Sequence, residues 1–410
     1  MRGVNRLRRM LRRPATFVRM ARGFRGVLHN GVAKDRYGAL IDFTYHHYAL
    51  GDTLTGLVKF ACEAEDRGAR AVDLFVYVNP GLPRAPAQGF ITPDNYQSYL
   101  DSLFPAFLCQ PHLASLRLIR DPLTLALTMA SMHWSGAPHW PSLKQHTERR
   151  MTYPVGHQEI NAFHARNGRL PLLEAPRGYE GWARRFRETV LKDRFVVCIN
   201  PRQAKLTPTP TTTHRDAPLS EWYAFIDRAA ETMPDVVFLM LGGFQEWEHR
   251  LLSRRNVMIP RLTGLGLAHE LALMHVADAF IGTSSGFATK ATFSDRPYLI
   301  VDIEAFFSTY IEVPVGGERY PFAVDHQRLV WTKENADLLY DYLAELYSAT
   351  TGRQPARLAG RPAANAASAN AASANAASAN AASAGASAGG SGGAGDGASG
   401  AEVLQAGARS

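Results

Sequence analysis

Residues 279–301 of this 410-residue chain read AFIGTSSGFATKATFSDRPYLIV. The apolar run Ala279-Phe280-Ile281 has the composition of a buried strand, and a turn containing Ser and Gly follows it. We expect a helix from Phe287 to Phe293 and a second strand from Pro297 to Val301. A strand, a crossover helix and a second strand form a parallel unit. The stretch therefore predicts an α/β fold.

The preceding residues extend this unit into a doubly wound sheet of about five parallel strands. Such a sheet binds ligands at the carboxyl ends of its strands, so the turns after those strands are the places to look for a site. The further expected strands are Phe195–Ile199, Val236–Leu241 and Asn256–Ile259, and the further expected helices are Leu219–Thr232 and Gly266–His275.

A second α/β pattern occupies the first half of the chain. A strand is expected over Ala39–Tyr45, a helix from about Thr53 to Asp66, and another strand over residues 71–78. These three elements form a second parallel unit. Residues 100–180 are rich in His, Trp and Pro and give no clear pattern. A last helix, about Glu334 to Tyr347, is expected to cross back onto the first domain.

The two ends of the chain differ in composition from the rest. Residues 1–34 carry nine Arg, one Lys and no acidic residue, so the remainder has 35 basic against 37 acidic residues. The body is therefore not basic, which argues against a nucleic-acid partner. Residues 1–28 form a basic amphipathic arm suited to an anionic membrane surface, and a solvated tail or a packed helix remains the alternative. Residues 351–410, with their Asn-Ala-Ala-Ser-Ala repeats, have the composition of a disordered tail.

The three cysteines, Cys62, Cys109 and Cys198, are far apart in the sequence and fit no metal-binding or disulfide spacing. Cys198 lies inside an apolar strand-like run, which favours a buried thiol. A reducing cytoplasm suits this cysteine usage best. No apolar run reaches 18 residues, so no membrane-spanning segment is expected. No metal site and no cofactor are predicted.

The turn Ser284-Ser285-Gly286-Phe287 is the most specific local feature. It follows the strand that ends at Ile281 and opens a helix, where backbone N–H groups converge and bind phosphate oxygens. The alternative is a glycine turn in which a serine caps the helix. The turn's place at the carboxyl end of a parallel strand favours the phosphate interpretation.

Two further turns carry polar residues. Arg202, Lys205 and Arg215 follow the strand Phe195–Ile199 and would neutralise a diphosphate, unless their loop is simply solvated. Asp52, in Leu50-Gly51-Asp52, follows the first strand of the chain. It is a candidate general base for an acceptor hydroxyl, and the alternative is a helix N-cap. His46 and His47 are alternative bases.

These residues carry a resemblance to a known family. The Leu50-Gly51-Asp52 turn, together with the run from Leu262 to Leu299, resembles heptosyltransferase-like enzymes of the GT-B superfamily, and more loosely fucosyltransferase-like members. The resemblance implies two facing Rossmann-like domains with parallel sheets, Asp52 as base and the second turn at the donor's phosphates. The family usually has Asp-Ser/Thr-Gly followed by His, whereas this chain has Ser284 and Thr289 there. The sugar is therefore left open.

The resulting hypothesis is a glycosyltransferase that needs no metal, transferring a hexosyl or heptosyl group from a nucleotide-sugar donor to a hydroxyl of a glycan or lipid-linked acceptor. A nucleotide-sugar epimerase or an inactive nucleotide-binding protein are the alternatives. The expected location is cytoplasmic, at the inner face of the membrane. The expected division is an arm (1–34), an acceptor domain (35–180), a donor domain (181–332), a returning helix (333–350) and a tail (351–410).

Overall fold

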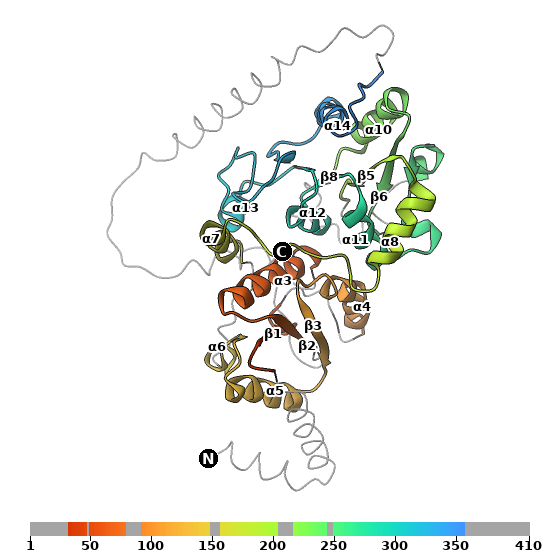
Figure 1. Cartoon of the computed structure of the whole chain (residues 1–410). Coiled ribbons are helices and arrows are strands. Elements are labelled where there is room, and N and C mark those ends of the chain that lie inside the picture. The colour runs from red at the N-terminus through yellow and green to blue at the C-terminus, as the bar shows by residue number, and fades with distance from the viewer. Residues whose placement is uncertain are drawn as a thin grey trace, which may run out of the picture. The chain divides into compact units, whose positions relative to one another are not determined.

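The computed structural model describes residues 32–46, 49–78, 92, 94–147, 156–203, 216–243 and 249–356. These residues belong to one compact unit. The predicted basic arm and the predicted tail beyond residue 356 lie outside the described residues. No described helix is long and apolar enough to cross a membrane. Figure 1 shows the helices and strands with the labels used below.

The unit contains two parallel sheets, which confirms the predicted α/β class. The first has the strand order β3-β2-β1-β4 and the second β10-β9-β8-β5-β6-β7. Every strand pair in both sheets is parallel. The strands are β1 (Arg36–Asp42), β2 (Ala71–Tyr77), β3 (Leu113–Ile119), β4 (His139–Trp140), β5 (Phe195–Asn200), β6 (Val236–Met240), β7 (Val257–Met258), β8 (Ala279–Thr283), β9 (Tyr298–Val301) and β10 (Gln327–Leu329).

Helices connect the strands and cover both faces of each sheet. They are α3 (Leu50–Asp66), α4 (Tyr96–Phe107), α5 (Pro122–Ser135), α6 (Leu143–Thr147), α7 (His157–Asn167), α8 (Glu180–Phe186), α10 (Leu219–Thr232), α11 (Leu267–Val276), α12 (Gly286–Thr292), α13 (Phe307–Ile311) and α14 (Ala336–Thr351). Short turns of other helix types cover Arg187–Leu191, His249–Ser253 and Pro260–Thr263. The stretch 100–180, which gave no sequence pattern, thus supplies β3, β4 and several helices.

The central strand β5 explains the layering. Its six residues are all buried, as expected for a parallel strand covered on both faces. Val196 and Cys198 join a core that includes α11, α12 and α3, whereas Val197 and Ile199 face a separate core with α10. Side chains alternate across a strand, so one strand serves both cores. The predicted burial of Cys198 is confirmed, and burial raises the pKa of its thiol.

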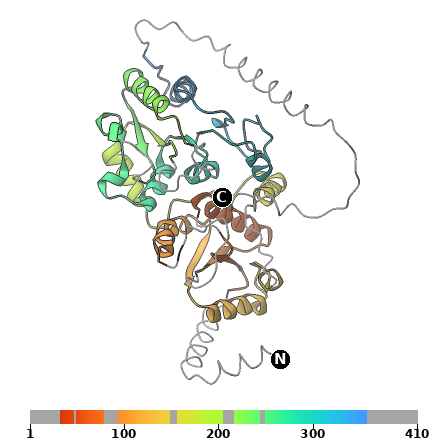
Figure 2. The same cartoon turned by 180° about the vertical axis from the view of Figure 1, so that it is seen from behind.

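The first sheet is layered in the same way. Leu54 and Leu57 of α3 pack on one face, and Met129 and Met132 of α5 pack on the other. Figures 1 and 2 show α3 and α5 on opposite sides of β1–β3. Helix α5 is capped at both ends. Asp121 accepts a hydrogen bond from the Thr124 N–H at 2.8 Å, and Gly136 ends the helix at a φ of 69°.

The last helix does not return to the first domain, so that prediction was wrong. Leu339 and Leu343 of α14 pack with Trp222 and Phe225 of α10, on the outer face of the second sheet. The Tyr340 hydroxyl also donates to Thr232 Oγ1 at 2.9 Å. Figure 2 shows the two helices side by side. The apolar stripe of α14 packs on the apolar face of α10. Because hydrophobic burial is not directional, an apolar stripe in the sequence does not specify which surface it will cover.

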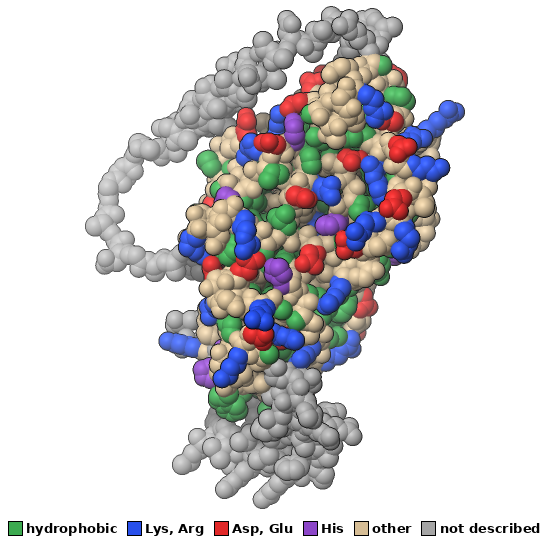
Figure 3. Space-filling model, viewed as in Figure 1, with side chains coloured by type: hydrophobic (Ala, Val, Ile, Leu, Met, Phe, Trp, Pro, Cys, Tyr) green, Lys and Arg blue, Asp and Glu red, His purple; other side chains and the backbone are tan. Residues whose placement is uncertain are grey.

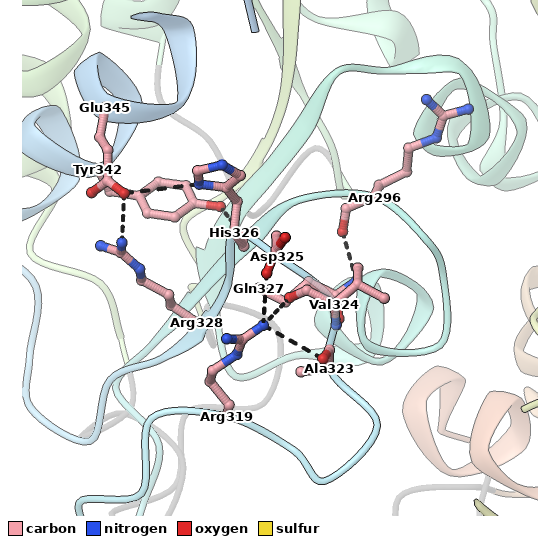
Figure 4. A network of polar contacts seen from close by, with 10 residues as sticks. All are labelled: Arg296, Arg319, Ala323, Val324, Asp325, His326, Gln327, Arg328, Tyr342 and Glu345. Carbon is pink, nitrogen blue, oxygen red and sulfur yellow. Dashed lines mark hydrogen bonds and ion pairs between the residues drawn. The ribbon is translucent and has the colours of Figure 1, made fainter. Parts of the chain in front are cut away.

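The edge strand β10 is fixed by a polar network at the amino ends of the strands (Figure 4). The Gln327 amide nitrogen donates to the carbonyl oxygens of Ser294 and Arg296, each at 2.9 Å, and its oxygen accepts from the Val324 N–H. Arg319 donates to the Val324 carbonyl oxygen. A buried amide with partners on both sides stabilises the loop that leads into β10. This network lies at the sheet edge opposite to the predicted site.

Helix α7 contacts residues that flank the second sheet through an aromatic stack. His157, at the start of α7, lies parallel to Tyr320 with 5.9 Å between ring centroids and packs on Phe293 at 5.6 Å. The ring is buried, and this burial lowers the pKa of His157 to about 4. The imidazole is therefore neutral in the folded chain at pH 7.

This neutral histidine gives an expected pH dependence. Between pH 6.5 and 4 the unfolded chain binds the proton that the folded chain rejects, so stability falls as the pH falls through this window. Between pH 7 and pH 5 the wild type should lose about 2 kcal/mol more than His157→Phe. Urea unfolding of both proteins at the two pH values measures this difference. Equal losses would show that His157 does not contribute.

Candidate active site

Two of the predicted turns lie together at the carboxyl ends of neighbouring strands. Strands β5 and β8 pair through Asn200 and Gly282, so the residues that follow each strand leave the sheet side by side. The Arg202 N–H donates to Thr283 Oγ1 at 3.1 Å. Arg202 is thereby held beside the turn that begins at Ser284.

The loop that carries Arg202 is fastened at both ends. The Ala217 N–H donates to the Arg202 carbonyl oxygen at 3.0 Å, and the Gln203 amide donates to the carbonyl oxygens of Arg202 and Ala217. The Arg202 guanidinium lies 3.8 Å from a carboxylate oxygen of Asp216, and its side chain is 20% exposed. Lys205 and Arg215 lie in the same loop, outside the described residues.

The turn after β8 caps the helix that follows it, which is one of the two interpretations that its sequence left open. Ser285 is the N-cap of α12, and its Oγ accepts from the Ala288 N–H at 3.3 Å, so the capping contact is present. The Ser284 N–H donates to the Val301 carbonyl oxygen and so belongs to the sheet. The Phe287 ring is part of the core. The Phe287 side chain therefore packs into the core and does not face a ligand.

Helix α3, the first helix among the described residues, meets this turn directly. A Cβ atom on Gly286 would lie 2.7 Å from Leu50 Cβ, and a Cβ atom on Gly51 would lie 2.9 Å from Thr289 Oγ1. Real Cβ contacts are essentially never this short, so a side chain at either position would force Leu50 or Thr289 to shift. Figure 1 shows α3 beside α12. The Leu50-Gly51-Asp52 turn of the first sheet and the Ser284–Phe287 turn of the second sheet are thus packed together.

Asp52 is the third residue of α3 and is half-buried. The helix begins at Leu50, three residues earlier than the sequence predicted, with Ala49 in the N-cap position. The interpretation of Asp52 as N-cap was therefore wrong. A carboxylate in the first turn interacts favourably with the positive end of a helix, by about 0.3–1 kcal/mol.

The alternative base His46 lies in a different environment. Its ring is 4% exposed and packs edge-on against Phe43, with 5.7 Å between centroids. Its backbone N–H donates to the Asp42 carbonyl oxygen. Such burial leaves little of the imidazole for an acceptor. His47 lies outside the described residues.

Sequence reasoning missed a carboxylate–imidazole pair at the carboxyl end of β1. Asp42 is buried, accepts from the Thr44 N–H at 2.8 Å, and has a carboxylate oxygen 3.5 Å from His146 Nε2. The signal for Asp42 was a charged residue at the end of an apolar strand. His146 lies in α6, a five-residue helix without any periodicity, so no signal marked it.

A buried glutamate was missed at the carboxyl end of β6. Glu270 accepts from the Gly242 N–H at 3.1 Å and from Arg261 at 2.7 Å. Burial raises the pKa of Glu270, against the pull of the Arg261 charge. Glu270 fixes the glycine turn after β6, on the same sheet edge as Arg202. The sequence around Glu270 predicted only a helix, so it gave no indication of the contact between Glu270 and Gly242.

The charges of the described surface are mixed. Figure 3 shows basic and acidic side chains interspersed over one face, as the balanced charge of the body predicted. Among the residues that the structure describes, no group of three or more His, Cys, Asp or Glu side chains is arranged to hold a metal.

No family model and no curated protein sequence matches the chain. Several solved structures are similar to it. A glycosyl transferase family 9 structure from Veillonella parvula has 10% identity and a TM-score of 0.43, covering 80% of this chain and 92% of that one. The E. coli ADP-heptose LPS heptosyltransferase II has 9% identity and a TM-score of 0.43, with coverages of 77% and 99%. A Listeria monocytogenes structure described as a putative UDP-N-acetylglucosamine 2-epimerase has 9% identity and a TM-score of 0.32, with coverages of 77% and 88%. The solved structures to which the chain is similar include a heptosyltransferase and a structure described as a putative epimerase.

Proposed function

We propose that the chain is a glycosyltransferase that moves a sugar from a nucleotide-sugar donor to a hydroxyl of a glycan or lipid-linked acceptor. One observation carries the proposal. The helix turn that bears Asp52 packs on the turn Ser284–Phe287, and Arg202 is hydrogen-bonded beside that turn. A potential base from one sheet and a potential phosphate-binding cation from the other therefore lie at one junction.

The chemistry is a displacement at the anomeric carbon of the donor sugar. Asp52 accepts the proton of the acceptor hydroxyl, whose oxygen forms the new bond to that carbon. The bond from the anomeric carbon to the diphosphate oxygen breaks, and the nucleoside diphosphate leaves with the electron pair. Arg202, Lys205 and Arg215 neutralise the charge that develops on the leaving oxygen, with the Ser284–Phe287 turn donating hydrogen bonds.

The chain has no Asp-x-Asp segment of the kind that holds a metal beside a diphosphate. The proposal therefore assigns charge neutralisation to the basic side chains. Residues 1–28, with their nine arginines, would bring the enzyme to the anionic inner face of the membrane, where lipid-linked acceptors lie. The transferred group is a hexosyl or heptosyl group.

Donor binding gives the first test. Arg202→Ala should weaken nucleoside diphosphate binding about ten- to a hundred-fold, because a charge-assisted contact contributes roughly 1.5–3 kcal/mol. Thermal shift with ADP, GDP and UDP measures it, since a ligand that binds only the folded chain raises its stability. Arg254→Ala is the matched control, because Arg254 pairs with Asp227 and lies before the amino end of β7, not at the carboxyl ends of the strands. Equal loss in both variants would contradict the assignment.

Product analysis separates the transferase from its alternatives. With a panel of nucleotide sugars, a transferase releases nucleoside diphosphate faster when an acceptor is present. An epimerase converts the donor without any acceptor, and an inactive protein binds without turnover. Either of the last two outcomes would overturn the proposal.

A further inference from the structure

A cavity of about 720 Å³ lies beside the first sheet, apart from the junction described above. It is bordered by the C-terminal half of α3, the end of α5, strand β4, and the helices α6 and α7. Its volume falls within the usual range for small-molecule sites, roughly 300–1,000 Å³. None of the residues assigned to the donor or to Asp52 lines it.

The charged groups that line this cavity balance one another. Lys59 is only 8% exposed, and its Nζ lies 2.7 Å from a carboxylate oxygen of Glu159 and 3.9 Å from one of Glu63. Arg67 adds a second cation. Two cations and two carboxylates leave no net charge, so neither an anion nor a cation is favoured. The Lys59 hydrogen bond and charge, against the opposing effect of burial, hold the pKa of Glu159 below its ordinary value.

The remaining lining suits a ligand with many hydroxyl groups. Gln145 and His133 offer hydrogen-bonding groups from two different helices, and the carboxylates accept hydrogen bonds. Trp140 supplies an aromatic ring. Its centroid lies 5.3 Å from that of the Phe60 ring and 5.8 Å from Lys59 Nζ, and these contacts hold the ring in place. An aromatic body with donors and acceptors around it matches a sugar ring, which has apolar C–H faces and a polar rim.

The cavity also lies along the same helix as the proposed base. Lys59 is seven residues after Asp52, which is about 10 Å along the axis and within about 20° of the same face. Glu63 continues that face. An acceptor longer than one sugar unit therefore has a second place to bind on the helix that carries Asp52.

We propose that this cavity binds an uncharged sugar unit of the acceptor. The identity of the occupant as acceptor rests on the proposed function, whereas the preference for a neutral sugar rests on the cavity alone. The class of ligand is a neutral saccharide, because two cations and two carboxylates balance and give a phosphorylated sugar no net attraction.

Direct binding tests the cavity without any donor. Saturation-transfer NMR with methyl glucoside, methyl galactoside, methyl mannoside and methyl N-acetylglucosaminide should show binding of at least one by the wild type. His133→Trp, which places a bulky ring at the exposed cavity wall, should weaken that binding at least ten-fold. Ala126→Trp adds the same bulk two turns earlier on α5 and should leave the affinity unchanged. Unchanged binding in His133→Trp, or tighter binding of glucose 6-phosphate than of the neutral sugars, would overturn the proposal.

A second variant covers the case in which the tryptophan perturbs folding. Glu159→Gln keeps the shape and can still accept from Lys59, but removes one charge, and should weaken the bound glycoside about ten-fold. With an active acceptor, both variants should raise the acceptor KM and leave kcat and the donor KM unchanged. If the protein has no transferase activity but its sugar binding is weakened by these variants, the sugar site in the cavity is supported and only the proposed function is refuted. Activity with normal acceptor KM in both variants would refute only the cavity.

Discussion

Replacing Asp52 by asparagine should reduce turnover about a hundred-fold or more while leaving nucleoside diphosphate affinity nearly unchanged. The substitution removes the proton acceptor but keeps the size and polarity of the side chain. Asp52 lies in the first turn of α3 and is not its cap, and the carboxylate's interaction with the helix dipole contributes about 0.3–1 kcal/mol to the helix. Steady-state release of nucleoside diphosphate, with donor and acceptor both present, measures the turnover.

Asp66→Asn is the matched control for this substitution. Asp66 is the last residue of the same helix and pairs with Arg166 at the surface. Its replacement should leave turnover within about two-fold, because a surface ion pair contributes little. Near-normal turnover in Asp52→Asn would remove Asp52 from the mechanism and make His47 and the Asp42–His146 pair the next candidates.

Replacing Gly286 by valine should disrupt the junction between the two sheets. Even a Cβ atom there would lie 2.7 Å from Leu50 Cβ and 3.1 Å from the Gly51 backbone nitrogen. The helices α3 and α12 must then separate, at a cost of about 1–3 kcal/mol in the free energy of unfolding. Because Asp52 follows Gly51, the shift also moves the base relative to the donor turn. A misplacement of about 1 Å can reduce turnover a hundred-fold.

Urea unfolding and turnover together test this expectation. Gly181→Val is the control, because the nearest atom to a Cβ on Gly181 is a flexible Arg185 nitrogen at 3.7 Å. That variant should be as stable as the wild type or slightly more stable, since glycine is a poor helix former. Normal stability and turnover in Gly286→Val would show that the contact between α3 and α12 is not needed.

Local sequence signals predicted the strands well. Residues such as Val196 and Val197 form a short, β-branched apolar run of the kind found in covered parallel strands, and β5 and β8 lie within one or two residues of their expected ends. The weakly patterned stretch 100–180 gave no such signal. Strand β4 has two residues and exists because it pairs with Gly38 and Ala39 of β1, a partner far away in the sequence.

The candidate site was likewise predicted in part from the sequence. The sequence by itself placed Arg202 and Ser284 at the carboxyl ends of parallel strands, because those ends of a parallel sheet share one edge. It did not determine that β5 and β8 are neighbours, or that α14 packs on α10, because apolar periodicity specifies a face and not its partner.

The sequence by itself determined this protein's α/β class, its two strand–helix patterns and the turns that carry its polar residues. The tertiary structure alone decided that Gly51 and Gly286 face each other, that Asp52 follows a residue packed on the Ser284–Phe287 turn, and that His146 reaches Asp42. The reason is physical. Strand and turn propensities are set by residues close in the chain, whereas the contact between α3 and α12 depends on the packing of side chains more than two hundred residues apart.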